Sequence, residues 1–252
     1  GWIDHTDSMG AAGRFGAGDV QWMTAGKGIQ HSEMFPLIHK DKENPLELFQ
    51  IWLNLPSASK FVEPHFKMLW NDAIPVAHEK DENGHDIEIQ VIAGALNDMK
   101  APEPTPDSWA SNPDNQVLIL TISMEAHAQW TLPIAGKGLN RTLYFYQGDR
   151  ISVETKDVMA NHSIQVHSDR DVLLKAGEEA CRILLLQGKP INEPVVQYGP
   201  FVMNTEEEIQ QAYRDYQRTQ FGGWPWPDHE QTHDRSKGRF ALHADGREEL
   251  RD

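Results

Sequence analysis

Residues Gly18 to Glu33, GDVQWMTAGKGIQHSE, decide the interpretation of this chain, because they end in a histidine and a carboxylate two positions apart. If they fold as a pair of β-strands closed by a turn at Gly26 and Gly28, His31 and Glu33 point to the same face, since side chains alternate along a strand. An imidazole and a carboxylate on one face form half of a mixed nitrogen and oxygen site of the kind that suits non-haem iron or another divalent first-row metal. The other half must come from elsewhere.

Two further motifs accompany this stretch: DHTDSMG from Asp4 to Gly10, and QYGPFVMNTEEEIQQA from Gln197 to Ala212. Together the three motifs resemble the pirin family, two-domain members of the cupin superfamily. The resemblance runs from the first residue to about Gly222. It implies an all-β fold of two cupin-type β-barrels, a bicupin, with a C-terminal helix that packs back on the first barrel.

The resemblance also implies one Fe(II) ion per chain in the first barrel, held by three His and one Glu. By that pattern His31 and Glu33 are metal ligands, and two further His ligands are expected upstream of Gly1, on an H-x-H strand. We therefore expect a truncated or incompletely represented polypeptide that holds iron weakly, loses it or takes another divalent metal, because water must replace each missing ligand. His5 lies in the turn motif H-x-D-S-x-G of the family, and we do not expect it to substitute as a ligand.

Three domains are expected from these observations. Residues 1–70 form the metal-binding barrel without its first strands, residues 71–195 form a second barrel without metal, and residues 196–252 form a helix and tail that dock on the first barrel. Trp224 and Trp226 are expected to anchor this tail by burying apolar area, which offsets the entropy of ordering it. Residues His243 to Asp252 are expected to be disordered.

Short apolar or alternating runs between Gly, Pro and Asp turns predict the strands. The predicted strands are Asp19–Met23, Ile29–Glu33, Leu48–Leu53, Val117–Ser123, Thr142–Gln147, Ile151–Thr155, Ser163–His167, Asp171–Lys175 and Arg182–Gln187. One helix is predicted after Thr205, because Thr205 and Glu208 form a capping-box pattern ahead of an apolar stripe that begins at Ile209.

Composition limits the classes of binding partner and the cellular location of the protein. The 252 residues carry 23 basic and 38 acidic side chains, a formal net charge of −15, which excludes direct nucleic-acid binding as a main activity. No apolar run reaches the length of a membrane helix. The one cysteine, Cys181, lies in the apolar run CRILLLQG and is predicted to be a buried core thiol. A reducing, cytoplasmic location is the expectation.

Other polar residues receive structural interpretations. Asp7, Ser8 and Asp19 are expected in turns, where their side chains bond the backbone. His162 and His167 are expected at turns or strand faces, because neither they nor His127 lie in an H-x-H pattern with a following carboxylate. His39, His65, His78 and His85 are predicted to be surface residues.

The resemblance implies an iron-dependent dioxygenase, a quercetin 2,3-dioxygenase that opens a flavonol ring with dioxygen and releases carbon monoxide. Glu33 would then accept the flavonol hydroxyl proton as a catalytic base, and the apolar side chains of Trp22, Met23 and Phe35 would line the pocket. Two alternatives stay open: a metal- or redox-responsive regulator that binds a transcription factor or metabolic enzyme, and a metal-depleted scaffold.

Overall fold

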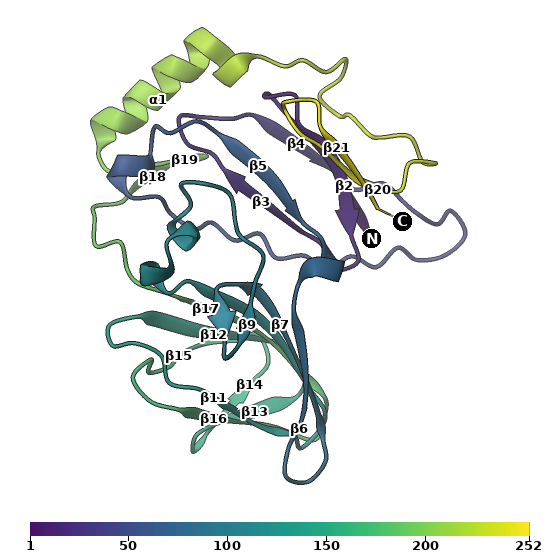
Figure 1. Cartoon of the computed structure of the whole chain (residues 1–252), viewed down its shortest axis with the longest axis vertical. Coiled ribbons are helices and arrows are strands. Elements are labelled where there is room, and N and C mark those ends of the chain that lie inside the picture. The colour runs from purple at the N-terminus through teal and green to yellow at the C-terminus, as the bar shows by residue number, and fades with distance from the viewer. Residues whose placement is uncertain (252) are drawn as a thin grey trace. The chain divides into compact units, whose positions relative to one another are not determined.

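The computed structural model describes residues 1–251, an all-β protein with one α-helix (Figure 1). These residues divide into two compact units that alternate along the sequence. The first unit comprises residues 1–71, residues 104–111 and the chain from Ile191 onward, and the second comprises residues 72–103 and 112–190. The division into three domains at residues 70 and 195 stays a prediction.

A five-stranded sheet forms the centre of the first unit, in the order β21-β20-β2-β1-β4. Its strands are β1 (Trp2–Asp7), β2 (Ala12–Gly16), β4 (His31–Met34), β20 (Arg239–Leu242) and β21 (Glu248–Arg251). Two smaller pairs complete the strands of this unit: β3 (Val20–Thr24) with β5 (His65–Leu69), and β18 (Val196–Tyr198) with β19 (Phe201–Met203). A small apolar core of Ile3, Phe15, Met68, Trp70 and Ala241 lies beside the sheet.

The predicted pairing of the two strands in the Gly18 to Glu33 stretch is wrong. β3 pairs with β5 and β4 pairs with β1, so the segment between them is not a hairpin turn. The backbone N–H of Lys27 donates to the carbonyl of Val62 at 2.9 Å, which holds the segment against another loop. Gly26 is required there, because a Cβ atom would lie 2.2 Å from that same carbonyl oxygen. His31 and Glu33 nevertheless share one face, since both lie on β4.

The predicted strand Leu48–Leu53 is also wrong. A strand needs a hydrogen-bonded neighbour, and this segment belongs to none of the ladders among residues 1–251. Its apolar side chains stay accessible: Trp52 is 59% exposed and Leu48 is 45% exposed. Alternating side chains in a sequence are therefore not enough to predict that a segment pairs in a sheet.

The second unit contains two sheets around one apolar core. The larger sheet has the order β15-β12-β17-β10-β7-β6 and the smaller has the order β11-β16-β13-β14. Their strands are β6 (Val76–Lys80), β7 (Asp86–Ala93), β10 (Leu118–Met124), β11 (Gln129–Leu132), β12 (Asn140–Gln147), β13 (Arg150–Val153), β14 (Lys156–Met159), β15 (His162–Gln165), β16 (Val172–Ala176) and β17 (Cys181–Gly188). A short pair, β8 (Ala95–Leu96) and β9 (Met99–Lys100), lies in the same unit.

Most of the strands predicted in this unit are confirmed within one or two residues, because their apolar positions alternate into the core. Leu118, Leu120 and Ile122 of β10 are all less than 9% exposed and belong to the apolar core of this unit. β7 was not predicted, although Ile87, Ile89 and Val91 alternate with polar residues and are buried. Cys181 is buried at the start of β17, which confirms its predicted place in the core.

The predicted helix is confirmed as α1 (Glu206–Thr219), in the first unit beside β18 and β19 (Figure 1). The hydroxyl of Thr205 accepts from the N–H of Glu208 at 3.2 Å, and the Glu208 carboxylate accepts from the N–H of Thr205 at 3.1 Å. This reciprocal pair satisfies two N–H groups that the first turn leaves without helical partners. Short 3₁₀ helices cover Ser57–Ser59, Asn71–Ala73, Trp109–Ser111, Pro113–Asn115 and Gln220–Gly222.

The tail after α1 is ordered rather than disordered over most of the predicted range. β20 pairs with β2, and β21 pairs with β20, so the last strands extend the central sheet. Trp226 docks as predicted, since its Nε1 donates to the carbonyl of Asp7 at 2.8 Å, whereas Trp224 donates to Asp228 within the tail. Asp252 lies outside the described residues. No helix among residues 1–251 is long and apolar enough to cross a membrane.

Candidate metal centre

The pairing of β1 with β4 brings four polar side chains to one face. In the antiparallel register His5 lies opposite Glu33, and Asp7 lies opposite His31. Residues directly opposite in such a pair point to the same side, and so do residues two apart on one strand. All four side chains therefore share a face, two from each strand.

Three of these side chains form a compact group of donor atoms. His5, His31 and Glu33 each offer one ligand atom, and these atoms all lie within 4.8 Å of one another. The Nδ1 atom of His31 is 3.7 Å from Oε1 of Glu33, and the His5 and His31 ring centroids are 5.7 Å apart. His5 is not expected as a ligand from the sequence, but in the structure it belongs to the group. Predicting His5 as part of the group would have required the register between β1 and β4, which is set by contacts between distant segments of the chain.

Burial gives the three groups different surroundings. His5 is completely buried, whereas the side chains of His31 and Glu33 are 35% and 26% exposed. Burial lowers the pKa of His31, and the neighbouring His5 lowers it further, against the opposing effects of Glu33 and Asp7. His31 is therefore neutral at pH 7, and a neutral imidazole has the lone pair that a metal ligand needs.

Asp7 orients His5. Its Oδ2 lies 3.4 Å from Nε2 of His5, while its Oδ1 accepts from the N–H groups of Met9 and Ala11, which confirms the predicted turn role. A proton on Nε2 that faces this carboxylate leaves the lone pair on Nδ1. That Nδ1 atom is buried and has no hydrogen-bond partner among the described residues. In metal sites a ligating histidine usually donates one ring N–H to a carboxylate and binds the metal through the other ring nitrogen.

Glu33 has a supporting residue on β3. The side-chain amide of Gln21 donates to Oε1 of Glu33 at 3.4 Å, and the Gln21 carbonyl oxygen is buried without a hydrogen-bond partner among residues 1–251. Trp22 points to the opposite face of β3 from Gln21, because neighbours on a strand alternate. Trp22 was the expected pocket residue on this strand, but Gln21 is the one whose side chain reaches Glu33. The donors present, two imidazole nitrogens and one carboxylate oxygen, fit a divalent first-row metal.

The tail supports the strand that carries His5. The ring of His233 contacts the carbonyl of His5, with Nε2 3.1 Å from that oxygen, and Phe66 stacks on the His5 ring at 5.1 Å between centroids. Burial lowers the pKa of His233, against the hydrogen bond to His5 that raises it. These contacts fix the backbone and the ring plane of His5 from two sides.

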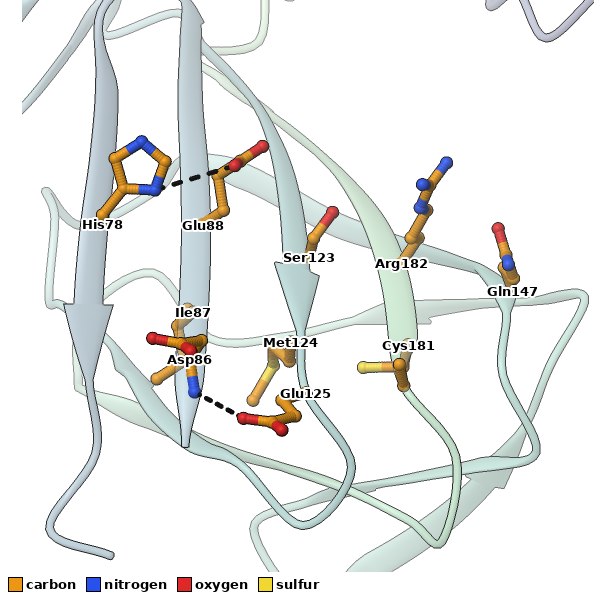
Figure 2. A pocket seen from close by; sticks show the side chains of 11 residues that line it. His78, Asp86, Ile87, Glu88, Ser123, Met124, Glu125, Gln147, Cys181 and Arg182 are labelled. Atoms are coloured by element: carbon orange, nitrogen blue, oxygen red, sulfur yellow. Dashed lines mark hydrogen bonds and ion pairs between the residues drawn. The ribbon is translucent and has the colours of Figure 1, made fainter. Parts of the chain in front are cut away.

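A separate hollow of about 380 Å³ lies in the second unit (Figure 2). It is lined by the residues His78, Asp86, Ile87, Glu88, Ser123, Met124, Glu125, Gln147, Ala180, Cys181 and Arg182. Nδ1 of His78 lies 3.7 Å from Oε2 of Glu88 on the neighbouring strand, and Figure 2 marks this pair with a dashed line. None of these residues belongs to the His5, His31 and Glu33 group.

Comparisons with known proteins agree with the motifs. The family model described as Pirin matches residues 1–53, and the one described as the pirin C-terminal cupin domain matches residues 119–222. Pirin-1 of Arabidopsis thaliana is 38% identical over 228 residues, which cover 88% of this chain and 72% of that protein. A Vibrio cholerae protein named as a candidate quercetin 2,3-dioxygenase is 34% identical over 228 residues, 88% of this chain and 73% of that protein.

Solved structures give the same result. The crystal structure of a quercetin 2,3-dioxygenase from Acinetobacter baumannii matches with a TM-score of 0.71 and 29% identity, and covers 88% of this chain and 73% of that chain. The strands and these comparisons define a protein with two cupin domains, a bicupin, with one C-terminal helix. Within that class, the chain belongs to the pirin family.

Proposed function

We propose that this protein is an Fe(II)-dependent dioxygenase of quercetin-type flavonols, with its metal on β1 and β4. The proposal takes His31 and Glu33 as ligands and adds His5 as a third. Two histidines and one carboxylate with open positions form the donor set of many non-haem iron oxygenases. One observation supports the proposal most: the three donor atoms lie within 4.8 Å of one another in a chain whose relatives include proteins named for quercetin 2,3-dioxygenase activity.

In this proposal the residues of the site have separate roles in metal binding and proton transfer. A bound divalent iron would supply a Lewis acid for the hydroxyketone oxygens and bring dioxygen within reach of the substrate. Glu33 is the candidate base for the flavonol hydroxyl proton, because its carboxylate is 26% exposed and Gln21 holds it in place. His5 is buried and cannot meet a substrate, so its role is to hold the ion while Asp7 fixes its ring.

The test combines metal content with loss of flavonol absorbance under air. The chain loaded with Fe(II) is expected to bind one iron and to consume quercetin with release of carbon monoxide. His31→Ala is expected to abolish both, while His162→Ala, an exposed histidine whose ring contacts two carbonyl groups of its own turn, is the matched control. Quercetin turnover that survives His31→Ala would refute this assignment. The two upstream His ligands and the cytoplasmic location stay predictions.

A further inference from the structure

Two histidines of the second unit lie next to each other on different turns. His85 ends the turn between β6 and β7, and His127 lies in the turn between β10 and β11. Their ring centroids are 6.3 Å apart and their planes make an angle of 56°. Two imidazoles on one tetrahedral ion have centroids about 5 Å apart, so the rings need to approach by only about 1 Å to share an ion.

Asp81 presets the ring of His85. The Asp81 carboxylate is 4% exposed, and its Oδ2 lies 3.0 Å from Nδ1 of His85. The same carboxylate accepts from the backbone N–H groups of Asn83, His85 and Gln129, which hold it in place. The Asp81 carboxylate can only accept, so Nδ1–H of His85 donates this hydrogen bond. Nε2 is left with its lone pair, as in a metal-binding histidine held by a carboxylate.

His127 has a carboxylate at a distance that suits a shared ion. Its Nε2 is 3.7 Å from Oε2 of Glu178, too far for a hydrogen bond. Two ligands on one tetrahedral zinc ion lie about 3.3 Å apart, so an ion fits between these atoms after a small movement. Both side chains have that freedom, since His127 is 57% exposed and Glu178 is 73% exposed.

The turns that carry these side chains are tied to one another. The N–H of Gln129 donates to Asp81, and the N–H of His127 donates to the carbonyl of Gly177, one residue before Glu178. Asp86 and Glu125 are joined by two further bonds of 2.9 Å, of which Figure 2 shows the one from the Asp86 N–H to the Glu125 carboxylate. His127 adopts a φ of 64°, a left-handed conformation that its turn enforces. The backbone is therefore preorganised and only side chains need to rotate.

We propose that His85, His127 and Glu178 form a second metal site, for a borderline divalent first-row ion such as Zn²⁺ or Cu²⁺. Imidazole and carboxylate donors suit these ions. The site is more open than the first one, because in the described part of the chain only His5, His31 and Glu33 have three donor atoms within 4.8 Å of one another. The proposal revises two expectations from the sequence, a second barrel without metal and a surface role for His85. It does not depend on the proposed dioxygenase activity.

The test uses the full, untagged chain with His31→Ala and Glu33→Gln, which remove the first candidate site. Isothermal titration with ZnCl₂ is expected to show one ion per chain, and Cu²⁺ is expected to give an electron paramagnetic resonance signal with two coupled nitrogens. Adding His85→Ala and His127→Ala is expected to weaken binding at least about tenfold and to remove both nitrogens. The matched control is His78→Ala with His167→Ala, since each of these histidines faces a carboxylate, at 3.7 Å and 3.8 Å.

The proposal is overturned if the background chain binds neither ion, or if the control pair weakens binding as much as the His85 and His127 pair does. A second variant tests the orienting role of Asp81. Asp81→Asn is expected to weaken Zn²⁺ binding by about 10- to 100-fold, with the far-UV circular dichroism spectrum and the thermal midpoint recorded alongside. Unchanged affinity in a folded Asp81→Asn protein would show that the ring of His85 is not preset for an ion.

Discussion

Arg14 and Asp4 are joined by two hydrogen bonds, from Nε to Oδ1 at 2.6 Å and from Nη2 to Oδ2 at 2.8 Å, and both side chains are buried. The same guanidinium donates to the carbonyl groups of His233, Asp234 and Lys237 in the tail. The pair therefore links β1 and β2 to the segment that leads into β20.

Replacing Arg14 by Met should lower the free energy of unfolding by about 3–5 kcal/mol, because it leaves the Asp4 carboxylate buried without its charge partner. Urea unfolding followed by tryptophan fluorescence measures the change. Lys27→Met is the matched control, since its ion pair with Glu63 is at least half exposed and is worth about 0–1 kcal/mol. Equal stability losses in the two variants would contradict the special role of the buried pair.

Asp7→Asn should reduce the metal affinity of the His5, His31 and Glu33 group by about 10- to 100-fold, because the amide no longer fixes the protonated nitrogen of His5. Asn keeps an acceptor for the N–H groups of Met9 and Ala11, so the turn should survive. Competition titrations with a metal indicator report the affinity, and Asp98→Asn, at an exposed position of the second unit, is the control for charge. Affinity unchanged by Asp7→Asn would exclude the orienting role.

Glu249 should make the first unit sensitive to acid. Burial would raise its pKa, but hydrogen bonds from Trp70, His243 and Arg247 outweigh that effect and lower the pKa to about 2, from an ordinary 4.5. Since the folded state binds the proton less readily than the unfolded state, this stabilisation is complete above pH 4.5 and is lost as the pH falls toward 2. Glu249→Gln should therefore lose less stability than the parent protein between pH 5 and 3.

The measurement is the free energy of unfolding across that pH range, compared for the parent protein, Glu249→Gln and Glu230→Gln. Glu230 is an exposed residue of the same tail and serves as the control. If the parent protein and Glu249→Gln lose stability in parallel as the pH falls, the hydrogen bonds of Glu249 do not act as described.

Cys181 should not react in the folded protein. Burial, with a smaller contribution from Asp149, raises the pKa of its thiol to about 12, and only the thiolate attacks disulfide reagents. At pH 8 a chromogenic disulfide reagent is expected to label no thiol in the native chain and one thiol per chain in denaturant. Rapid labelling of the native chain would mean that the start of β17 opens readily.

Local signals were sufficient for part of the fold. Thr205 and Glu208 lie three residues apart, so the start of α1 could be predicted from their spacing alone, and the strands of the second unit carry their own alternation. The pairing partner of each strand could not be predicted in this way, because register is set by contacts between distant segments. β3 pairs with β5 rather than β4, and Leu48–Leu53 joins no ladder among residues 1–251. No local pattern distinguishes these outcomes.

In the candidate site, too, some residues could be predicted from local sequence and others could not. His31 and Glu33 could be identified because they lie on one strand two residues apart. His5 and Gln21 could not, since each joins the group through a different neighbouring element: His5 through the pairing of β1 with β4, and Gln21 through a side-chain hydrogen bond from β3. His85 and His127 are 42 positions apart in the sequence and meet only because two turns are tied together.

The pairing of β2 with β20 has a consequence for biogenesis. Ala12 pairs with Leu242 across the sheet, so this contact cannot form on the ribosome until the chain as far as Leu242 has emerged. The strands of the second unit, from β6 to β17, are synthesised earlier and contain their own core, so they can fold while the opening strands still wait for their neighbours. During that interval the edge of β2 that later binds β20 presents unpaired backbone N–H and C=O groups, so chaperones that shield such an edge should matter most for this unit.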